Sequence, residues 1–131
     1  MNQHTKDQEV NFTGKKCCLF EFYNPKDAIL ANCLKVITDL GSGTDNKPFY
    51  TWDDGKRTLE QCKKCGALFL VQTSEFHSFN NDGDAIYIDW FQIEDATVAD
   101  RINELWSGFA LETNFKGPRI SYTNGIYNWE F

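Results

Sequence analysis

The sequence predicts a single α+β domain, with a mainly antiparallel sheet of about five to seven strands and two helices packed against it. Strand-like segments follow one another through short connections, which favours antiparallel pairing. Only two segments carry the apolar spacing of an amphipathic helix. The chain has 131 residues, 41% hydrophobic and 15% aromatic, which suits one core of ordinary size.

The chain begins with a polar stretch, in which Val10 and Phe12 are the sizeable apolar residues after the initial Met. We therefore expect residues 1–14 to form a flexible tail and residues 15–131 to form the domain. Residues 16–23 follow, with alternating side chains that predict the first strand.

A helix is expected to begin at Asn24, because Asn is a good N-cap and Pro25 suits the first helical position. Gly41 supplies a stop signal at the other end. An apolar face at helical spacing connects these two points: Ile29, Cys33, Val36 and Leu40.

The middle of the chain predicts a series of strands. Residues 49–52 form a short aromatic strand, residues 53–56 have strong turn chemistry, and residues 57–61 form the return strand. Residues 67–73 then read as a buried strand.

A loop rich in Asn, Asp and Gly is expected at residues 76–84, before the strongest strand of the chain at residues 85–93. A second helix is expected at residues 96–107 with Asp95 as N-cap. The last segment, 119–131, predicts a hairpin around Asn124-Gly125.

The net charge of −6 argues against a nucleic-acid backbone as the main partner, because such binding requires clustered Lys and Arg. Residues 66–100 contain seven acidic residues and no Lys or Arg. This stretch predicts a negative face, which is either an ordinary solvated surface or a docking face for a basic partner.

The five cysteines predict a reducing compartment. Their odd number, together with an N-terminus that lacks the apolar core of a secretory signal, argues against a disulfide framework. No apolar run is long enough to span a bilayer. We therefore expect a cytoplasmic protein that does not contact membranes.

The sharpest motif is Cys62-Lys63-Lys64-Cys65-Gly66, in which two thiolates can share one metal ion and Gly66 permits a tight turn. Zinc needs four ligands, and adjacent cysteines in a strand point apart. A structural zinc site here would take one of Cys17 and Cys18, plus His77 or an outside group, as its further ligands; the candidate set is Cys17, Cys62, Cys65 and His77. Two free cysteines in a turn are the simpler interpretation, and a redox dithiol is a third.

Catalysis has little support in the sequence. His77 could act as a general base oriented by Glu75 or Asp89, but a loop histidine satisfied by hydrogen bonds is the simpler explanation. We therefore expect no catalytic residues and no enzyme activity. Trp52, beside Asp53 and Asp54, is either a core residue or an exposed interface anchor.

Three segments, TWDDGKRTLEQCKKCGALFLVQTSEFHSF, YIDWFQIED and ADRINELWSGF, resemble small bacterial cytoplasmic proteins with a strand–CxxCG–strand core. In size and acidity the chain also resembles the immunity proteins of polymorphic toxin and contact-dependent growth-inhibition systems. This resemblance implies a monomer that forms a one-to-one complex with a cognate toxin domain, such as a basic nuclease, and covers its active-site cleft. The surface that we expect to bind it comprises Trp52, Asp53, Asp54, Glu75, Asp82, Asp84 and Asp89. The alternative is a zinc-knuckle regulatory domain with another partner.

Overall fold

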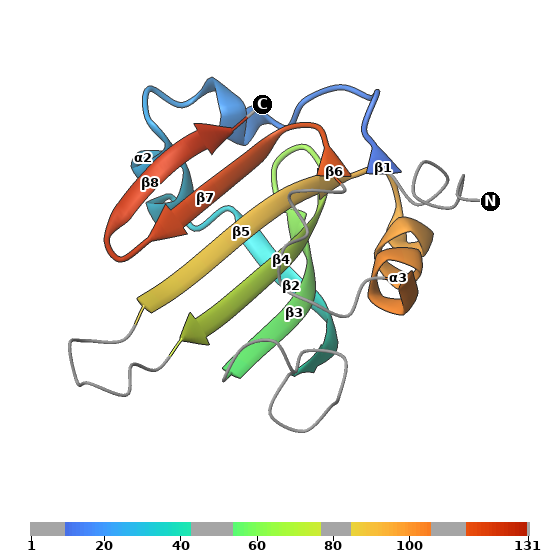
Figure 1. The fold of residues 1–131 in the computed structure, drawn as a ribbon. Helices are drawn as coiled ribbons and strands as arrows, with labels where there is room; N and C mark the ends of the chain where they lie inside the picture. The colour runs from blue at the N-terminus through green and yellow to red at the C-terminus, as the bar shows by residue number, and fades with distance from the viewer. Residues whose placement is uncertain (1–9, 43–53, 77–84, 106–114, 131) are drawn as a thin grey trace.

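The computed structural model describes residues 10–42, 54–76, 85–105 and 115–130, and confirms the α+β fold. Its centre is a six-stranded sheet in the order β2-β3-β4-β5-β7-β8, with every neighbouring pair antiparallel (Figure 1). The strands are β2 (Leu34–Ser42), β3 (Asp54–Cys62), β4 (Leu68–Phe76), β5 (Ala85–Ile93), β7 (Arg119–Thr123) and β8 (Ile126–Glu130).

Short elements complete the fold: η1 (Cys18–Glu21), α2 (Pro25–Leu30) and α3 (Ala96–Leu105). Strand β1 (Val10–Asn11) pairs in parallel with β6 (Phe115–Lys116), so the segment expected to be a tail is held to the fold from Val10 onward. Within the described ranges, no helix is long and apolar enough to cross a membrane.

The two faces of the central sheet carry two separate apolar clusters. On one face, Leu70 and its partner Phe91 pack with Ala99 and Ile102 of α3. On the other face, Val71 and its partner Trp90 pack beneath η1 and α2. The strand predicted at residues 85–93 is confirmed, and its side chains alternate between the faces, since Trp90 and Phe91 belong to opposite clusters.

The terminal hairpin is also confirmed. Asn124 and Gly125 connect β7 to β8, and both have positive φ angles, 45° and 98°. These angles are those of a type I′ turn, whose twist matches that of paired strands. In Figure 1, α2 lies beside this hairpin, and α3 stands at the other side of the molecule.

The long helix expected between residues 24 and 41 is wrong beyond its first turns. Asn24 does cap α2, accepting a 2.8 Å hydrogen bond from the Asp27 backbone N–H, but the helix ends at Leu30. Asn32 has a φ of 57°, which ends the helix, and β2 follows. The β-branched run Val36-Ile37-Thr38 favours a strand and outweighs the apolar spacing that suggested a helix.

The strand expected at residues 16–23 is replaced by the 3₁₀ turn η1. The backbone N–H groups of Phe20 and Phe22 donate to the carbonyls of Cys17 and Leu19 rather than to a neighbouring strand. Leu19 is fully buried and Phe20 packs on the same cluster. The segment therefore packs against one face of the sheet instead of joining it. The alternating sequence pattern of residues 16–23 does not distinguish such a covering segment from a strand.

The turn expected at residues 53–56 is wrong for its described part, because β3 already begins at Asp54. Asp54, Gly55 and Lys56 pair with Glu75, Ser74 and Thr73 of β4. The expected strands at 57–61 and 67–73 lie within β3 and β4 and are confirmed. Helix α3 begins at Ala96 with Asp95 as its cap, as expected. The expected strand 49–52 and most of the loop 76–84 lie outside the described residues.

Candidate metal centre

Four cysteines from two distant segments meet at one end of the sheet. Cys17 and Cys18 come from the N-terminal segment, and Cys62 and Cys65 from the turn between β3 and β4. All four Sγ atoms lie within 4.8 Å of one another. The Cys17–Cys65 and Cys18–Cys62 sulfur distances are 3.5 and 3.7 Å. The arrangement can offer four sulfur ligands to one metal ion.

The presence of both Cys17 and Cys18 departs from the expected ligand set. The sequence argument admitted only one of them because neighbouring side chains in a strand point to opposite faces. Cys17 is instead extended (φ −62°, ψ 151°) and caps the 3₁₀ turn that Cys18 begins. The change of backbone conformation between Cys17 and Cys18 places both Sγ atoms in the four-cysteine cluster. His77 lies outside the described residues.

A buried glutamine, Gln92, positions Cys17 and Cys18, the N-terminal pair of cysteines. Gln92 of β5 accepts a 2.9 Å hydrogen bond from the Cys17 backbone N–H, and its amide donates at 2.9 Å to the Lys15 carbonyl. Gln92 is 2% exposed, and its bond to the Cys17 N–H is buried, whereas its bond to the Lys15 carbonyl is partly buried. The sequence analysis missed this residue, although a signal existed: Gln92 continues the row in which Ile86, Ile88 and Trp90 are apolar.

The backbone of the β3–β4 turn positions the other pair. The Cys62 N–H donates to the Ala67 carbonyl at 2.8 Å, and the Gly66 N–H donates to the Cys62 carbonyl at 2.9 Å. Gly66 has a φ of 83°, which a residue with a Cβ rarely adopts. The Lys63 N–H donates to the Cys33 carbonyl at 2.7 Å, which connects the turn to the segment after α2.

Three of the four thiols, Cys17, Cys18 and Cys65, have shifted pKa values. Burial is the main cause that raises the pKa of Cys17 far above its usual value. Burial, followed by hydrogen bonds with the Cys62 and Cys65 thiols, raises the pKa of Cys18 to about 11. For Cys65 burial acts in the same direction, but hydrogen bonds from the backbones of Cys18 and Ala67 and from two thiols outweigh it and lower the pKa to about 7. Of these three thiols, Cys65 therefore ionises most readily at neutral pH.

A pocket of about 560 Å³ opens beside the cluster. Its lining includes Cys17, Cys18 and Cys65, with Phe12 and Leu68 as apolar walls. Cys65 is exposed, whereas Cys17 and Cys62 are each 1% exposed. The fifth cysteine, Cys33, is buried outside the cluster, and its Sγ lies 3.9 Å from the Ala31 carbonyl.

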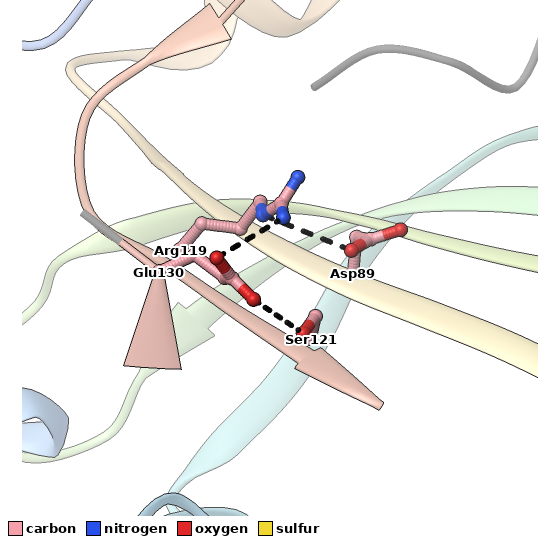
Figure 2. Close-up of polar contacts among 4 residues, drawn as sticks. All are labelled: Asp89, Arg119, Ser121 and Glu130. Atoms are coloured by element: carbon pink, nitrogen blue, oxygen red, sulfur yellow. Dashed lines mark hydrogen bonds and ion pairs between the residues drawn. The ribbon is translucent and has the colours of Figure 1, made fainter. Parts of the chain in front are cut away.

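On the face of the sheet that α3 covers, a second group of polar residues involves Asp89, one of the expected partner-binding acids. Arg119 lies between Asp89 and Glu130, with nitrogen–oxygen distances of 3.8 Å to each, and Ser121 donates to Glu130 at 3.3 Å (Figure 2). The side chains of Asp89 and Arg119 are each 16% exposed. The Asp89 carboxylate is thus engaged within the sheet.

The group formed by Asp89, Arg119, Ser121 and Glu130, which we call the polar row, continues into β4 and β3. Asp89 is the register partner of Gln72, which is the partner of Arg57. Arg57 donates from Nε to the Gln72 amide oxygen at 2.8 Å, and both side chains are fully buried. Burial lowers the pKa of Arg57 to about 10. The sequence analysis did not identify Arg57, Gln72 or Arg119 as a connected group.

Two other expected partner-binding residues, Asp54 and Glu75, lie at the far end of the sheet. Asp54 and Glu75 are register partners on β3 and β4, eight residues along β3 from Cys62. At the usual rise per strand residue this is about 26 Å from the cysteine end. Trp52, Asp53, Asp82 and Asp84 lie outside the described residues.

The chain was compared with models of protein families, with curated proteins and with solved structures, and none of them matches it.

Proposed function

We propose that the four-cysteine cluster is a structural zinc centre, and that the chain is a non-catalytic binding protein whose N-terminal segment is fastened to the sheet by the metal. One observation carries this proposal: the four Sγ atoms lie within 4.8 Å of one another although the two pairs are more than forty residues apart in the chain.

The sulfur spacing fits the metal. Zinc binds four cysteine sulfurs tetrahedrally at about 2.3 Å, which separates the sulfurs by about 3.8 Å. The shorter sulfur distances, 3.5 and 3.7 Å, are close to this value. The remaining pairs need to move by at most about 1 Å to reach it.

The surrounding charges also favour the metal-bound form. Four thiolates around one Zn²⁺ carry a net charge of −2. Lys15 and Lys16 directly precede the first cysteine pair, and Lys63 and Lys64 lie between the second pair. These four lysines are exposed and can offset that charge without being desolvated. An acidic protein thus has a local excess of positive charge where a zinc–thiolate centre needs it.

A centre of this kind is structural rather than catalytic. Four protein ligands occupy every position of a tetrahedral zinc ion, so none remains for water or substrate. The thiols also need to stay reduced to hold the metal, which favours a cytoplasmic location.

The metal would connect the two parts of one apolar cluster. Cys17 and Cys62 belong to the same buried group as Leu19, Phe69 and Trp90. The covering segment contributes only a 3₁₀ turn of 4 residues and a helix of 6, too short to be stable alone. Zinc would therefore supply the fastening that regular secondary structure does not.

The test is metal content and ligand identity. We expect about one zinc per chain by mass spectrometry of the natively purified protein. Replacing zinc by Co²⁺ should give the intense thiolate charge-transfer and visible bands of tetrahedral sulfur coordination. Cys62→Ser should lose these bands, whereas Cys33→Ala, which alters a cysteine outside the cluster, should keep them. A natively purified and metal-reconstituted protein without bound zinc or cobalt would contradict the proposal.

For the partner, we propose a basic toxin domain, so that the chain acts as an immunity protein. The support is the net charge of −6, the resemblance of the sequence, and the pairing of Asp54 with Glu75 at the end of the sheet away from the four-cysteine cluster. An acidic surface of this kind speeds association with a basic partner.

The partner proposal is tested by rescue of growth. The C-terminal domain encoded immediately upstream is expressed under tight control in a laboratory bacterium, with and without this protein. Growth arrest that this protein relieves is the expected result. Asp82→Lys with Asp84→Lys should weaken the complex, whereas Glu21→Lys with Asp39→Lys, on two exposed acids outside the acidic stretch 66–100, should not. A harmless upstream domain, or arrest that soluble protein does not relieve, would contradict the proposal.

A further inference from the structure

We propose that Cys65 is an oxidation site for hydrogen peroxide, and that its conversion to a disulfide with Cys17 releases the zinc ion from the centre. The inference rests on the proposed zinc centre and adds a regulation to it. Three observations lead to it: the exposure of Cys65, the pocket beside it, and the position of the Cys17 sulfur.

Access singles out Cys65. Of the four clustered cysteines, Cys65 is the exposed one. It also lines the 560 Å³ pocket that opens to solvent. Cys17 and Cys62 are each 1% exposed, and Cys18 is partly buried. Oxidation of thiols follows exposure and thiolate character, and zinc binding keeps the sulfurs as thiolates. A small oxidant therefore meets the Cys65 sulfur first.

The Cys17 sulfur is placed to resolve the first product. It lies 3.5 Å from the Cys65 sulfur, the shortest of the sulfur distances described above. Its position is fixed by the Gln92 hydrogen bond to its backbone and by burial in the apolar cluster. A neighbouring thiolate held this close favours disulfide formation over further oxidation.

The reaction balances with one peroxide molecule. The Cys65 thiolate attacks one peroxide oxygen, the O–O bond breaks, and a sulfenic acid and hydroxide form. The Cys17 thiolate then attacks the Cys65 sulfur, the S–O bond breaks, and a second hydroxide leaves as the disulfide forms. Two thiolates are oxidised by two electrons, and peroxide is reduced to two hydroxide ions.

The product changes how the same two segments are fastened. Only Cys18 and Cys62 remain as thiolates, and two ligands hold zinc much more weakly than four. The new disulfide joins residues 48 apart in the chain, and so links the N-terminal segment to the β3–β4 turn covalently. Oxidation should therefore release zinc while leaving the fold intact, unlike chelation, which removes the metal and supplies no replacement.

The experiment uses the zinc-loaded, full-length protein and hydrogen peroxide. Zinc release is followed with a colorimetric chelator, and the disulfides are mapped by mass spectrometry of peptides. We expect loss of about one zinc per disulfide formed, a Cys17–Cys65 crosslink, and recovery of zinc binding after reduction. The oxidised protein should keep a melting temperature above that of the reduced, chelated protein.

Two variants sharpen the test. Cys33→Ala leaves the cluster intact and should release zinc at the rate of the unaltered protein. Cys17→Ser removes the resolving sulfur, so Cys65 should accumulate as a sulfenic acid that dimedone traps. If that variant folds poorly, the peptide map of the unaltered protein decides alone.

The outcomes separate the two proposals. Native protein without zinc would overturn the zinc centre and this inference together. A protein that contains zinc and retains it after peroxide treatment would overturn this inference alone. A Cys62–Cys65 disulfide in place of Cys17–Cys65 would also overturn it, because the resolving sulfur would then lie within the turn.

Discussion

The two faces of the sheet are closed by covers of different kinds. On one face, α3 follows directly after β5, and Val98, Ala99 and Ile102 pack at helical spacing onto Leu70 and Phe91. On the other face, the cover is residues 15–33, which contain a 3₁₀ turn and a helix of only 6 residues. The first cover has its own regular structure, whereas the second contributes two sulfurs, from Cys17 and Cys18, that meet the sulfurs of Cys62 and Cys65 in the β3–β4 turn.

The difference shows what an irregular segment needs in order to close a core. A ten-residue amphipathic helix gains backbone hydrogen bonds and a continuous apolar face at once. Residues 15–33 gain fewer internal hydrogen bonds, and they depend on Gln92 and on the cysteines to hold them. We therefore expect the two covers to respond differently to metal removal and to mutation.

Cys62→Ser should have the largest effect. It removes one ligand and introduces a hydroxyl into the buried cluster, and loss of a structural metal site typically costs more than about 4 kcal/mol. Urea unfolding in the presence of zinc measures the loss. Cys33→Ala is the control and should cost clearly less. Equal losses for both variants would mean that Cys62 acts only through its packing.

Ile102→Ala should come next. This side chain is 2% exposed in the cluster beneath α3, and truncating a buried isoleucine costs about 2–5 kcal/mol. The variant should bind zinc as tightly as the unaltered protein, because the cysteines lie on the other side of the sheet. Chelator competition checks this, and a weakened zinc site would show that the two covers are coupled.

Gln92→Leu tests the positioning of the N-terminal pair. It keeps the approximate volume but leaves the Cys17 N–H and the Lys15 carbonyl without this partner, at a cost of about 1–3 kcal/mol. Zinc affinity should fall as well, since Cys17 is no longer held in place. If affinity measured by chelator competition is unchanged, the thiols themselves fix the segment.

Glu130→Gln should have the smallest effect. Its carboxylate is 44% exposed and lies 3.8 Å from Arg119, so the ion pair is screened by water and is worth less than about 1 kcal/mol. Thermal unfolding in low and high salt gives the value. A loss of several kcal/mol would show that the polar row of Figure 2 carries far more stability than its geometry implies.

The sequence predicted most of what depends on local patterns. Residues 85–93 and the Asn124-Gly125 hairpin are confirmed, because alternation and turn chemistry act within a few residues. It was wrong where tertiary contacts decide the outcome. Residues 34–42 pair with β3 despite helical spacing, and residues 16–23 cover the sheet instead of joining it.

The candidate site was half predictable for the same reason. The CxxCG turn is a local motif, so Cys62 and Cys65 were identified directly. The participation of both Cys17 and Cys18 depends on a backbone change between them, and the role of Gln92 depends on a contact 75 residues away. Neither feature has a local signature strong enough to predict it without the fold.

Hydrogen exchange followed by mass spectrometry can compare residues 15–33 with residues 96–102 before and after zinc is removed under reducing conditions. We expect residues 15–33 to lose protection on metal removal, while residues 96–102 in α3 keep theirs. Unchanged protection in residues 15–33, with zinc shown to be gone, would contradict the claim that metal fastens this cover to the sheet.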